Sequence, residues 1–139
     1  MEPIGGVGRS PKMKHLLACA TALALTACTM TAEPTPTAIP AALHGTWGLT
    51  ALDCVPGRAD NKGMITVDAS SVKSYESRGV LTSASTSTTT SISGTFAFTG
   101  EGQTWTRQMS LRLADSTHLV RSESGADALP APLTYTKCP

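Results

Sequence analysis

Polar and apolar residues alternate through most of the chain from His44 onward, and no long stretch repeats its apolar residues at helical spacing. This alternation is typical of strands that bury one face and expose the other. The clearest case is a predicted hairpin around the turn at residues 100–102. Before the turn, one parity holds Ile92, Gly94, Phe96 and Phe98, and after it one parity holds Trp105, Met109, Leu111 and Leu113.

Turn signals rich in Gly, Pro, Asp and Ser divide the rest of this region into short strands. Including the hairpin, we expect about eight strands. They are at residues 45–52, 64–68 and 72–76, at residues 80–81 leading into 82–95, in the hairpin at residues 92–98 and 104–113, and at residues 118–123 and 133–137. Residues 82–95 hold eleven Ser or Thr in fourteen positions, which favours an edge strand or a loose hairpin that leads into the strand holding Phe96 and Phe98. The fold class is therefore all-β. Closure into a small antiparallel barrel hides the strand edges most economically, and a two-sheet sandwich is the alternative.

The N-terminal region has the features of a secretory signal. A basic start at residues 13–15 precedes the apolar run at residues 16–25, and Leu25-Thr26-Ala27-Cys28 follows. Ten apolar residues span about 15 Å as a helix, too short for a bilayer core of about 30 Å. The last four residues resemble the lipobox of bacterial lipoproteins. This resemblance implies that the signal peptide, residues 1–27 with Met13 as the true start, is cleaved and that Cys28 carries a diacylglycerol and an acyl chain.

The lipobox resemblance also implies where the protein is located. Several acyl chains on one residue hold a protein stably on a membrane. Thr29, rather than Asp, follows Cys28, which by similarity to the sorting rule of Gram-negative lipoproteins implies the periplasmic face of the outer membrane. Residues 28–43 contain three prolines among Thr and Ala and are expected to form a flexible tether, with the β domain at residues 44–139.

Two cysteines remain for the folded domain after this processing. Cys19 leaves with the signal peptide and Cys28 takes the lipid, so Cys54 and Cys138 are free to pair in an oxidising compartment. A disulfide between them would close a loop of about 85 residues and contribute about 4–5 kcal/mol in the chain-entropy model. The sequence lacks the C-x-x-C and H-x-x-x-H spacings of metal sites, so we expect neither a metal nor a cofactor.

The charge balance excludes one class of partner. Lys and Arg number 11 against 10 Asp and Glu, only 15% of residues are charged and 4% are aromatic. A nucleic-acid-binding domain needs a basic surface, and a base-stacking surface needs aromatic residues. We therefore expect no nucleic-acid partner. The lipobox resemblance instead implies the membrane as a partner, through the lipid anchor, together with an envelope protein.

The sequence contains no G-x-S-x-G, H-E-x-x-H or Walker A motif, and we expect no enzyme activity. The mature chain has two histidines: His44 lies where the tether meets the domain, and His118 lies on a predicted strand. Asp115, Glu123 and Asp127 fall near turns, where carboxylates are usually solvated, and none forms a recognisable acid–base pair. A hydrolase, the least favoured hypothesis, would require a histidine and a carboxylate together in a polar cleft.

The first predicted strand begins with Gly45-Thr46-Trp47, which resembles the G-x-W motif of lipocalin-like (calycin) β-barrels. In that family a basic residue from a late strand packs over the tryptophan. Both Arg121 and Lys137 are candidates for this role. The resemblance implies a barrel and makes a small-molecule-binding protein the alternative functional hypothesis.

Arg107 shares the parity of Trp105 and Met109, which places a charge on the apolar face of its strand. Since an unpaired buried charge is costly, Arg107 must be paired, for example with Glu76, or lie near the barrel mouth. A second interpretation is that Arg107 anchors an anionic ligand head group. In that case Trp47 and Trp105 would complete the ligand-binding site.

The longest irregular segment of the domain, residues 122–130, contains Ser124-Gly125. This dipeptide resembles the start of the loop that periplasmic C-type lysozyme inhibitors insert into a lysozyme cleft. In those inhibitors an aromatic residue follows, whereas Ala126 follows here. A structural connector is the alternative interpretation of this loop. The lipid anchor, the tether, the expected disulfide and the absence of catalytic motifs lead to the first functional hypothesis, a lipid-anchored envelope protein with a non-catalytic, protein-binding or inhibitor-like β domain.

Overall fold

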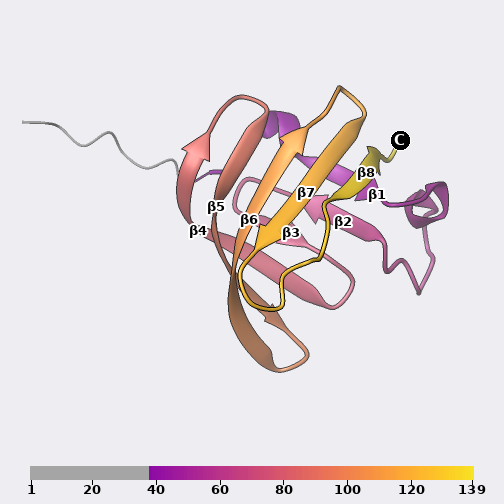
Figure 1. Cartoon of the computed structure of the whole chain (residues 1–139). Coiled ribbons are helices and arrows are strands. Elements are labelled where there is room, and N and C mark those ends of the chain that lie inside the picture. Colours follow the sequence, from indigo (N-terminus) through magenta and orange to yellow (C-terminus); the bar gives the residue numbers. More distant parts are fainter. Residues whose placement is uncertain (1–37) are drawn as a thin grey trace, which may run out of the picture. The chain divides into compact units, whose positions relative to one another are not determined.

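The computed structural model describes residues 38–139, and the predicted signal peptide, Cys28 and most of the predicted tether lie outside that range. Eight strands form a closed antiparallel barrel in which each strand pairs with the next and β1 pairs with β8 (Figure 1). The all-β fold and the barrel are thus confirmed, and the sandwich is not adopted. The elements are η1 (Ala41–Leu43), β1 (Gly45–Gly48), η2 (Ala51–Cys54), β2 (Met64–Val67), β3 (Ser71–Lys73), β4 (Ser77–Ser87), β5 (Ser91–Gly100), β6 (Gln103–Leu113), β7 (His118–Ser124) and β8 (Leu133–Lys137).

The inward faces of β5 and β6 follow the parities expected from the sequence. Ile92, Phe96 and Phe98 are buried on β5, and Met109 and Leu111 are buried on the neighbouring strand, where Leu111 lies opposite Ile92. Gly79, which pairs with Phe98, makes room for the phenyl ring, because a Cβ at this position would lie 2.5 Å from a ring carbon. Side chains therefore fill the middle of the barrel. The buried apolar core consists of Ile39, Leu43, Trp47, Ile65, Val67, Val72, Leu81, Ala84, Ile92, Phe96, Phe98, Met109, Leu111, Leu119 and Tyr135.

The two ends of the barrel differ because of the N-terminal segment. The loops β2–β3, β4–β5 and β6–β7 lie at the end where β1 begins, and η1 lies against this end in Figure 1. Ile39 and Leu43 are buried there, and the Ile39 amide donates a hydrogen bond to the Ala69 carbonyl (2.8 Å). We call this the closed end. We call the other, which carries the loops β1–β2, β3–β4, β5–β6 and β7–β8, the open end.

This packing corrects the expected boundary of the tether. The sequence predicts residues 39–43 as part of the flexible segment 28–43, because its three prolines and several small residues form no recognisable strand or helix pattern. In the structure Ile39 and Leu43 belong to the core, and the indole N–H of Trp47 donates to the Leu43 carbonyl (3.1 Å). The barrel domain therefore begins before His44.

The first strand is shorter than the expected 45–52, because the chain leaves the barrel wall after Gly48 to form η2. Asp53 accepts hydrogen bonds from both the amide (2.8 Å) and the hydroxyl (2.9 Å) of Thr50. It also accepts one from the Gly63 amide (3.3 Å). Burial raises the pKa of Asp53, but these hydrogen bonds outweigh it and leave the pKa below its usual value. Asp53 thus fixes the start of the long β1–β2 loop.

The Ser/Thr-rich region forms the upper part of the long β4–β5 hairpin, as expected. Within the described chain, β3 pairs with β4 only as far as Val80, so the later part of β4 pairs with β5 alone. Two register shifts interrupt that pairing, and the hydroxyls of Thr82 and Ser85 donate to the carbonyls of Thr95 (3.0 Å) and Ser93 (3.1 Å). The predicted strand at 72–76 is also shorter, because residues 74–76 form the turn between β3 and β4.

The predicted disulfide between Cys54 and Cys138 is present, with 5.3 Å between the two Cα atoms and a sequence separation of 84 residues. It joins η2 to the end of the chain just after β8. The Cys138 amide donates to the Thr46 carbonyl (2.9 Å), which extends the β1–β8 pairing that closes the barrel. In residues 38–139 no helix is long and apolar enough to cross a membrane.

Candidate binding site at the open end of the barrel

Three charged side chains lie inside the barrel near its open end. Arg107 comes from β6, and Arg121 and Glu123 come from β7, with exposed side-chain fractions of 16%, 12% and 5%. One carboxylate oxygen of Glu123 lies 3.4 Å from Nε of Arg107, and the other accepts hydrogen bonds from Nε (3.0 Å) and Nη2 of Arg121. Two guanidinium groups therefore share one buried carboxylate.

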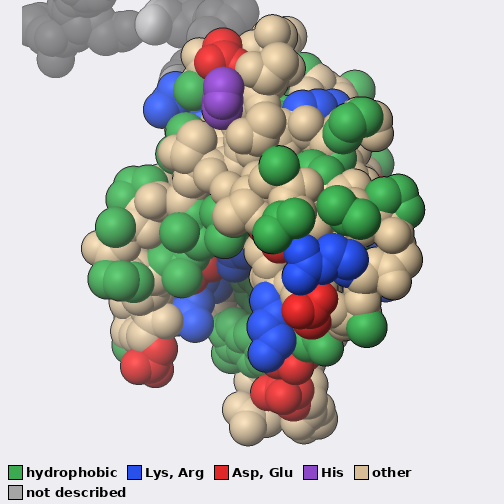
Figure 2. Space-filling view, turned by 90° about the vertical axis from the view of Figure 1, so that its right-hand side faces the viewer, with side chains coloured by type: hydrophobic (Ala, Val, Ile, Leu, Met, Phe, Trp, Pro, Cys, Tyr) green, Lys and Arg blue, Asp and Glu red, His purple; other side chains and the backbone are tan. Residues whose placement is uncertain are grey.

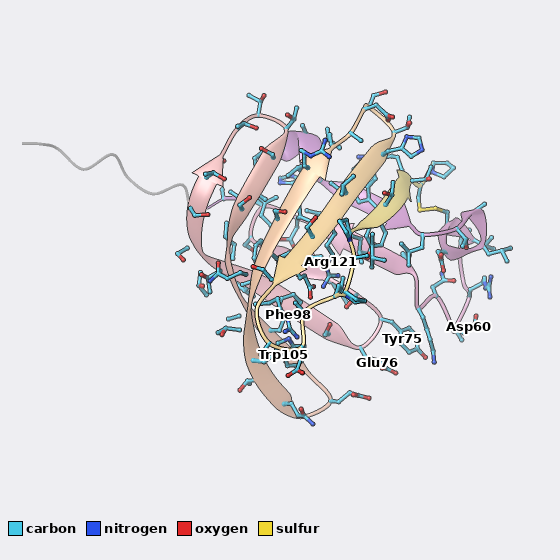
Figure 3. The ribbon with its side chains drawn as sticks, viewed as in Figure 1. Asp60, Tyr75, Glu76, Phe98, Trp105 and Arg121 are labelled. Carbon is cyan, nitrogen blue, oxygen red and sulfur yellow. A yellow bond between two sulfur atoms is a disulfide. The ribbon has the colours of Figure 1, made fainter. Side chains whose placement is uncertain are left out.

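Aromatic side chains continue this cluster toward the solvent. The rings of Phe98 and Trp105 stack with 5.5 Å between their centroids and an interplanar angle of 10°. The guanidinium carbon of Arg121 lies 5.9 Å from the centroid of Phe98. Figure 3 shows Phe98 and Trp105 together at the lower end of the barrel, with Arg121 above them. The open end thus has an inner layer that is both cationic and aromatic.

Tyr135 borders the cluster from β8, the strand that pairs with β7. Burial raises the pKa of its hydroxyl, and the charge and hydrogen bond of Arg121 offset only part of this effect. Tyr135 is therefore neutral at physiological pH and acts on Arg121 as a dipole rather than as a second anion. The Arg107–Arg121–Glu123 cluster keeps its excess of one positive charge.

A hollow of about 560 Å³ opens between the β5–β6 turn, the β3–β4 turn and the β7–β8 loop, and it reaches Arg107 and Trp105. Ligand-binding pockets commonly have this size. The Arg107 guanidinium also donates to the Ala126 carbonyl, which fastens the β7–β8 loop to the barrel. The exposed carboxylates of Glu76, Glu101 and Asp127 contribute to the lining. The hollow therefore combines a cationic floor with an acidic rim.

Exposed apolar residues gather in the loops of the same end. The described residues have five exposed large hydrophobic side chains, and only Val80 among them is not in an open-end loop. Leu52, the most exposed at 61%, lies in the β1–β2 loop with Leu49 and Val55, and Tyr75 lies in the β3–β4 turn. Figure 2, which views the side that carries η2, shows hydrophobic side chains bordering a hollowed area where acidic and basic side chains gather.

Two of the three predicted ligand-binding residues come together in the structure and the third does not. Trp105 and Arg107 both line the hollow. Trp47 is fully buried toward the closed end, and Lys137 lies over its indole with Nζ 4.4 Å from the ring centroid. Trp47 therefore offers no accessible surface in this structure and belongs to the core rather than to the hollow.

The contact between Trp47 and Lys137 resolves the choice between Arg121 and Lys137 in favour of Lys137. Lys137 Nζ also donates to the His44 carbonyl (2.6 Å). Gly45 has a φ of +127°, and a Cβ at this position would lie 2.8 Å from Lys137 Nζ. Glycine at the first position of the G-x-W pattern therefore makes space for the cation that covers the tryptophan.

The partner of Arg107 differs from the expected one. The sequence suggested Glu76, but this residue lies at the rim of the hollow and the ion pair is formed with Glu123. Glu123 was also expected to be solvated because it lies near a turn, whereas β7 continues to Ser124 and turns its side chain inward. The parity of Leu119, Arg121 and Glu123 is the sequence signal that identifies the cluster.

A histidine–carboxylate pair lies at the closed end, contrary to the expectation that Asp115 has no such partner. His118 Nδ1 lies 2.8 Å from an Asp115 oxygen, and both side chains are exposed. Asp115 also accepts hydrogen bonds from the amide (2.7 Å) and the hydroxyl (2.9 Å) of Thr117. The pair therefore holds the β6–β7 turn. In the described chain no group of three or more His, Cys, Asp or Glu side chains has the arrangement of a metal site.

The chain matches no protein-family model, and searches of curated proteins and of solved structures also give no match.

Proposed function

We propose that this protein is a lipid-anchored cell-envelope lipoprotein whose barrel binds another protein through its open end, without catalysis and in the manner of an inhibitor or an assembly factor. The observation that carries the proposal is the surface of the open-end loops, where the β1–β2 loop and the β3–β4 turn expose four hydrophobic side chains. Between the β3–β4 turn and two other loops of this end lies the hollow that contains Trp105 and Arg107. Contiguous exposed apolar residues with a polar rim are typical of protein interfaces, and Trp and Arg are enriched among the residues that dominate binding energy.

The packed interior favours protein contact over transport of a small molecule. Trp47, Phe96 and Leu111 are fully buried, and the remaining interior is filled by other core side chains. A lipocalin-like carrier needs a cavity within the barrel, and here a small ligand would have to bind in the hollow at the mouth. The hollow is the observation that favours this second candidate function, because its size and polar floor suit a small anionic molecule.

The position of the lipid anchor is consistent with an open end that faces a partner. The described chain begins next to η1 at the closed end, ten residues after Cys28. Ten residues reach at most about 35 Å when fully extended. A barrel held by Cys28 would therefore have its point of attachment at the closed end, which leaves the open end free for a partner.

The anchor is tested by the intact mass of the protein extracted from membranes. The expected mass corresponds to a chain that begins at Cys28 and carries a diacylglycerol and an acyl chain. The Cys28→Ser variant is expected to lose the lipid and to leave the membrane fraction. An unmodified Cys28 in the wild type would contradict the anchor and leave the binding proposal for the barrel standing.

Protein binding is tested with a double variant of the exposed apolar residues in the open-end loops, which we call the rim variant. Full-length protein in detergent is immobilised and incubated with envelope extract, and the Leu52→Ser/Tyr75→Ser variant is compared with Val80→Ser. Val80 is a matched control because it is also exposed but lies on the barrel wall. We expect a discrete set of proteins that the wild type and the control retain and the rim variant loses. Equal retention by all three proteins, with no inhibition of lysozymes or envelope proteases by the wild type, would contradict the proposal.

A further inference from the structure

The charges inside the barrel mouth do not balance. Glu123 is the acceptor for Arg107 and Arg121, and it also accepts a weak hydrogen bond from the Leu129 amide (3.4 Å). Both of its oxygens are therefore occupied. Because the three side chains are nearly buried, the excess positive charge lies in a region of low effective dielectric, where it acts more strongly on a bound group than it would in water.

Arg107 is the cation with unused hydrogen-bonding capacity toward the hollow. A guanidinium has five N–H donors. In the described part of the chain, the Arg107 guanidinium is joined to Glu123 through Nε and to the Ala126 carbonyl through Nη1. Arg107 has no buried nitrogen atom that lacks a hydrogen-bond partner, so its remaining N–H groups are exposed. The Arg107 side chain also lines the hollow. Donors at the floor of the hollow are thus accessible.

The rim limits what can reach these donors. Glu76, Glu101 and Asp127 are exposed and line the same hollow. A polyanion would be repelled by these carboxylates, whereas cationic groups on either side of a single carboxylate would be attracted to them. The face of Trp105 offers an additional surface for a cation or for an alkyl chain.

We infer that the hollow binds a single carboxylate, presented by a partner protein and flanked by Lys or Arg residues. The carboxylate bonds to the free N–H groups of Arg107, and the flanking cations lie against the acidic rim and Trp105. This inference rests on the proposed protein-binding function of the open end and specifies the chemistry that it recognises. The carboxylate is either an Asp or Glu side chain or the C-terminus of the partner.

The test uses short peptides without aromatic residues, titrated at low salt into full-length protein in detergent and followed by tryptophan fluorescence. The pair acetyl-Lys-Glu-Lys-amide and acetyl-Lys-Gln-Lys-amide isolates the carboxylate. Acetyl-Lys-Lys-Gly with a free C-terminus represents a chain end, and acetyl-Glu-Glu-Glu-amide represents a polyanion. For the wild type we expect the Glu peptide to bind about ten-fold more tightly than the Gln peptide, as for a charge-assisted hydrogen bond. The tri-Glu peptide should bind less tightly than the Lys-Glu-Lys peptide.

Two variants separate recognition from folding. Arg107→Gln leaves Glu123 paired with Arg121, so the barrel retains no unpaired buried charge and is expected to fold. It should bind the Glu and Gln peptides equally. The matched control is Arg112→Gln, on the same strand but exposed on the outer face, and it should keep the ten-fold preference.

Glu123→Gln removes the carboxylate that competes with the peptide for Arg107. Its effect on the affinity for the Glu peptide should therefore be opposite to that of Arg107→Gln. It should raise the affinity for the Glu peptide several-fold, while a purely structural role of the cluster predicts weaker binding or none. Glu101→Gln should weaken binding of the Lys-Glu-Lys peptide and strengthen binding of the tri-Glu peptide.

Binding of either the internal Glu peptide or the free C-terminus supports the inference, and the tighter of the two identifies the source of the carboxylate. A wild type without carboxylate preference, or an Arg107→Gln variant that retains it, overturns the inference. The proposed function is tested separately by the rim variant with Leu52→Ser and Tyr75→Ser. If that variant loses its partner while the peptides fail to bind, protein binding stands and carboxylate recognition falls.

Discussion

The closed and open ends of this barrel are built from the same strands and differ in the side chains at the inward positions. At the closed end, Ile39 and Leu43 cover the interior and join the apolar core. At the open end, a cluster of charged and aromatic side chains lies beneath an accessible hollow. The comparison indicates that the closed end contributes stability and that the open end is available for recognition.

The difference between the two ends can be followed along the inward side chains of one strand, β6. β6 runs from the open to the closed end. Its inward residues change from half-buried Trp105 and nearly buried Arg107 to buried Met109 and fully buried Leu111, and partly buried Leu113 ends the strand. An apolar side chain contributes to stability in proportion to the area that it removes from water. The same substitution should therefore cost more stability at positions nearer the closed end, and the predictions below test this gradient.

Removal of the disulfide should have the largest effect on stability. The bond closes the loop between Cys54 and Cys138, which are 84 residues apart. The chain-entropy model gives a loss of about 4–5 kcal/mol for such a loop. We expect urea unfolding of the double variant Cys54→Ser/Cys138→Ser to show a loss of this order. A loss below about 1 kcal/mol would contradict the view that the bond fixes the β1–β8 closure.

Truncating the two tryptophans compares the ends directly. Trp47→Ala removes a fully buried ring and should cost about 3–5 kcal/mol. Trp105→Ala removes a half-buried ring and its stacking on Phe98, and it should cost about 1–2 kcal/mol. Chemical unfolding measures both values. Calorimetric titration with the Lys-Glu-Lys peptide, which needs no tryptophan at the site, should show that only Trp105→Ala weakens binding while the protein remains folded. Equal losses of stability would abolish the proposed division between the ends.

Removing the cation above Trp47 should have a smaller effect. Lys137 contacts the indole face and donates to the His44 carbonyl. Because exposed cation–π contacts contribute about 0.5–1 kcal/mol, Lys137→Met should destabilise the protein by about this amount. Methionine keeps much of the alkyl packing, so the variant isolates the charge. Thermal unfolding provides the measurement, and an unchanged midpoint would show that only the alkyl chain of Lys137 matters.

Much of the barrel could be predicted from the sequence, because its long strands have a regular alternation. The β5–β6 hairpin, β8 and the disulfide follow from parity, turn residues and cysteine processing. The β1–β2 loop and η1 could not be predicted in this way. Leu49 and Leu52 look like strand residues, but Asp53 binds the Thr50 backbone and turns the chain outward. Ile39 and Leu43 lie in a Pro-rich segment, and they are buried only because they cover the interior at the closed end of the barrel.

The candidate site was only partly predictable for a related reason. The inward position of Arg107 follows from the alternation of β6, but alternation does not identify its partner on the neighbouring strand. Glu123 pairs with it because Met109 and Glu123 are register partners on β6 and β7, which brings the two side chains to neighbouring levels. The turn residues near Glu123 predict a solvent-exposed side chain, but β7 continues one residue beyond Glu123.

Acid should destabilise the turns of the closed end, with the smallest of the predicted effects. Hydrogen bonds from Ser70 and Ser71 lower the pKa of Asp68 to about 2, and hydrogen bonds from Thr117 and His118 lower the pKa of Asp115 to about 2. Folded-state values below the unfolded value of 3.8 mean that the ionised carboxylates stabilise the fold above about pH 4. This contribution is lost as the pH falls through about 2.

The corresponding measurement is the unfolding midpoint between pH 5 and pH 2, at constant ionic strength, for the wild type, Asp68→Asn and Asp115→Asn. Each variant should be less stable than the wild type at pH 5, and the difference should shrink as the pH falls. A difference that remains constant down to pH 2 would show that the charge of that carboxylate does not contribute. Glu101→Gln at the open end provides the exposed carboxylate control.

Site-directed photo-crosslinking in intact cells tests the central claim most directly, because it compares the two ends in the native envelope. A photoreactive phenylalanine analogue replaces Leu52, Tyr75 or Gln103 at the open end, or Thr89 or Ser116 at the closed end, one position at a time. We predict protein crosslinks from the open-end positions and none, or only lipid adducts, from the closed-end positions. Protein crosslinks of equal yield from both ends, or concentrated at the closed end, would contradict the account.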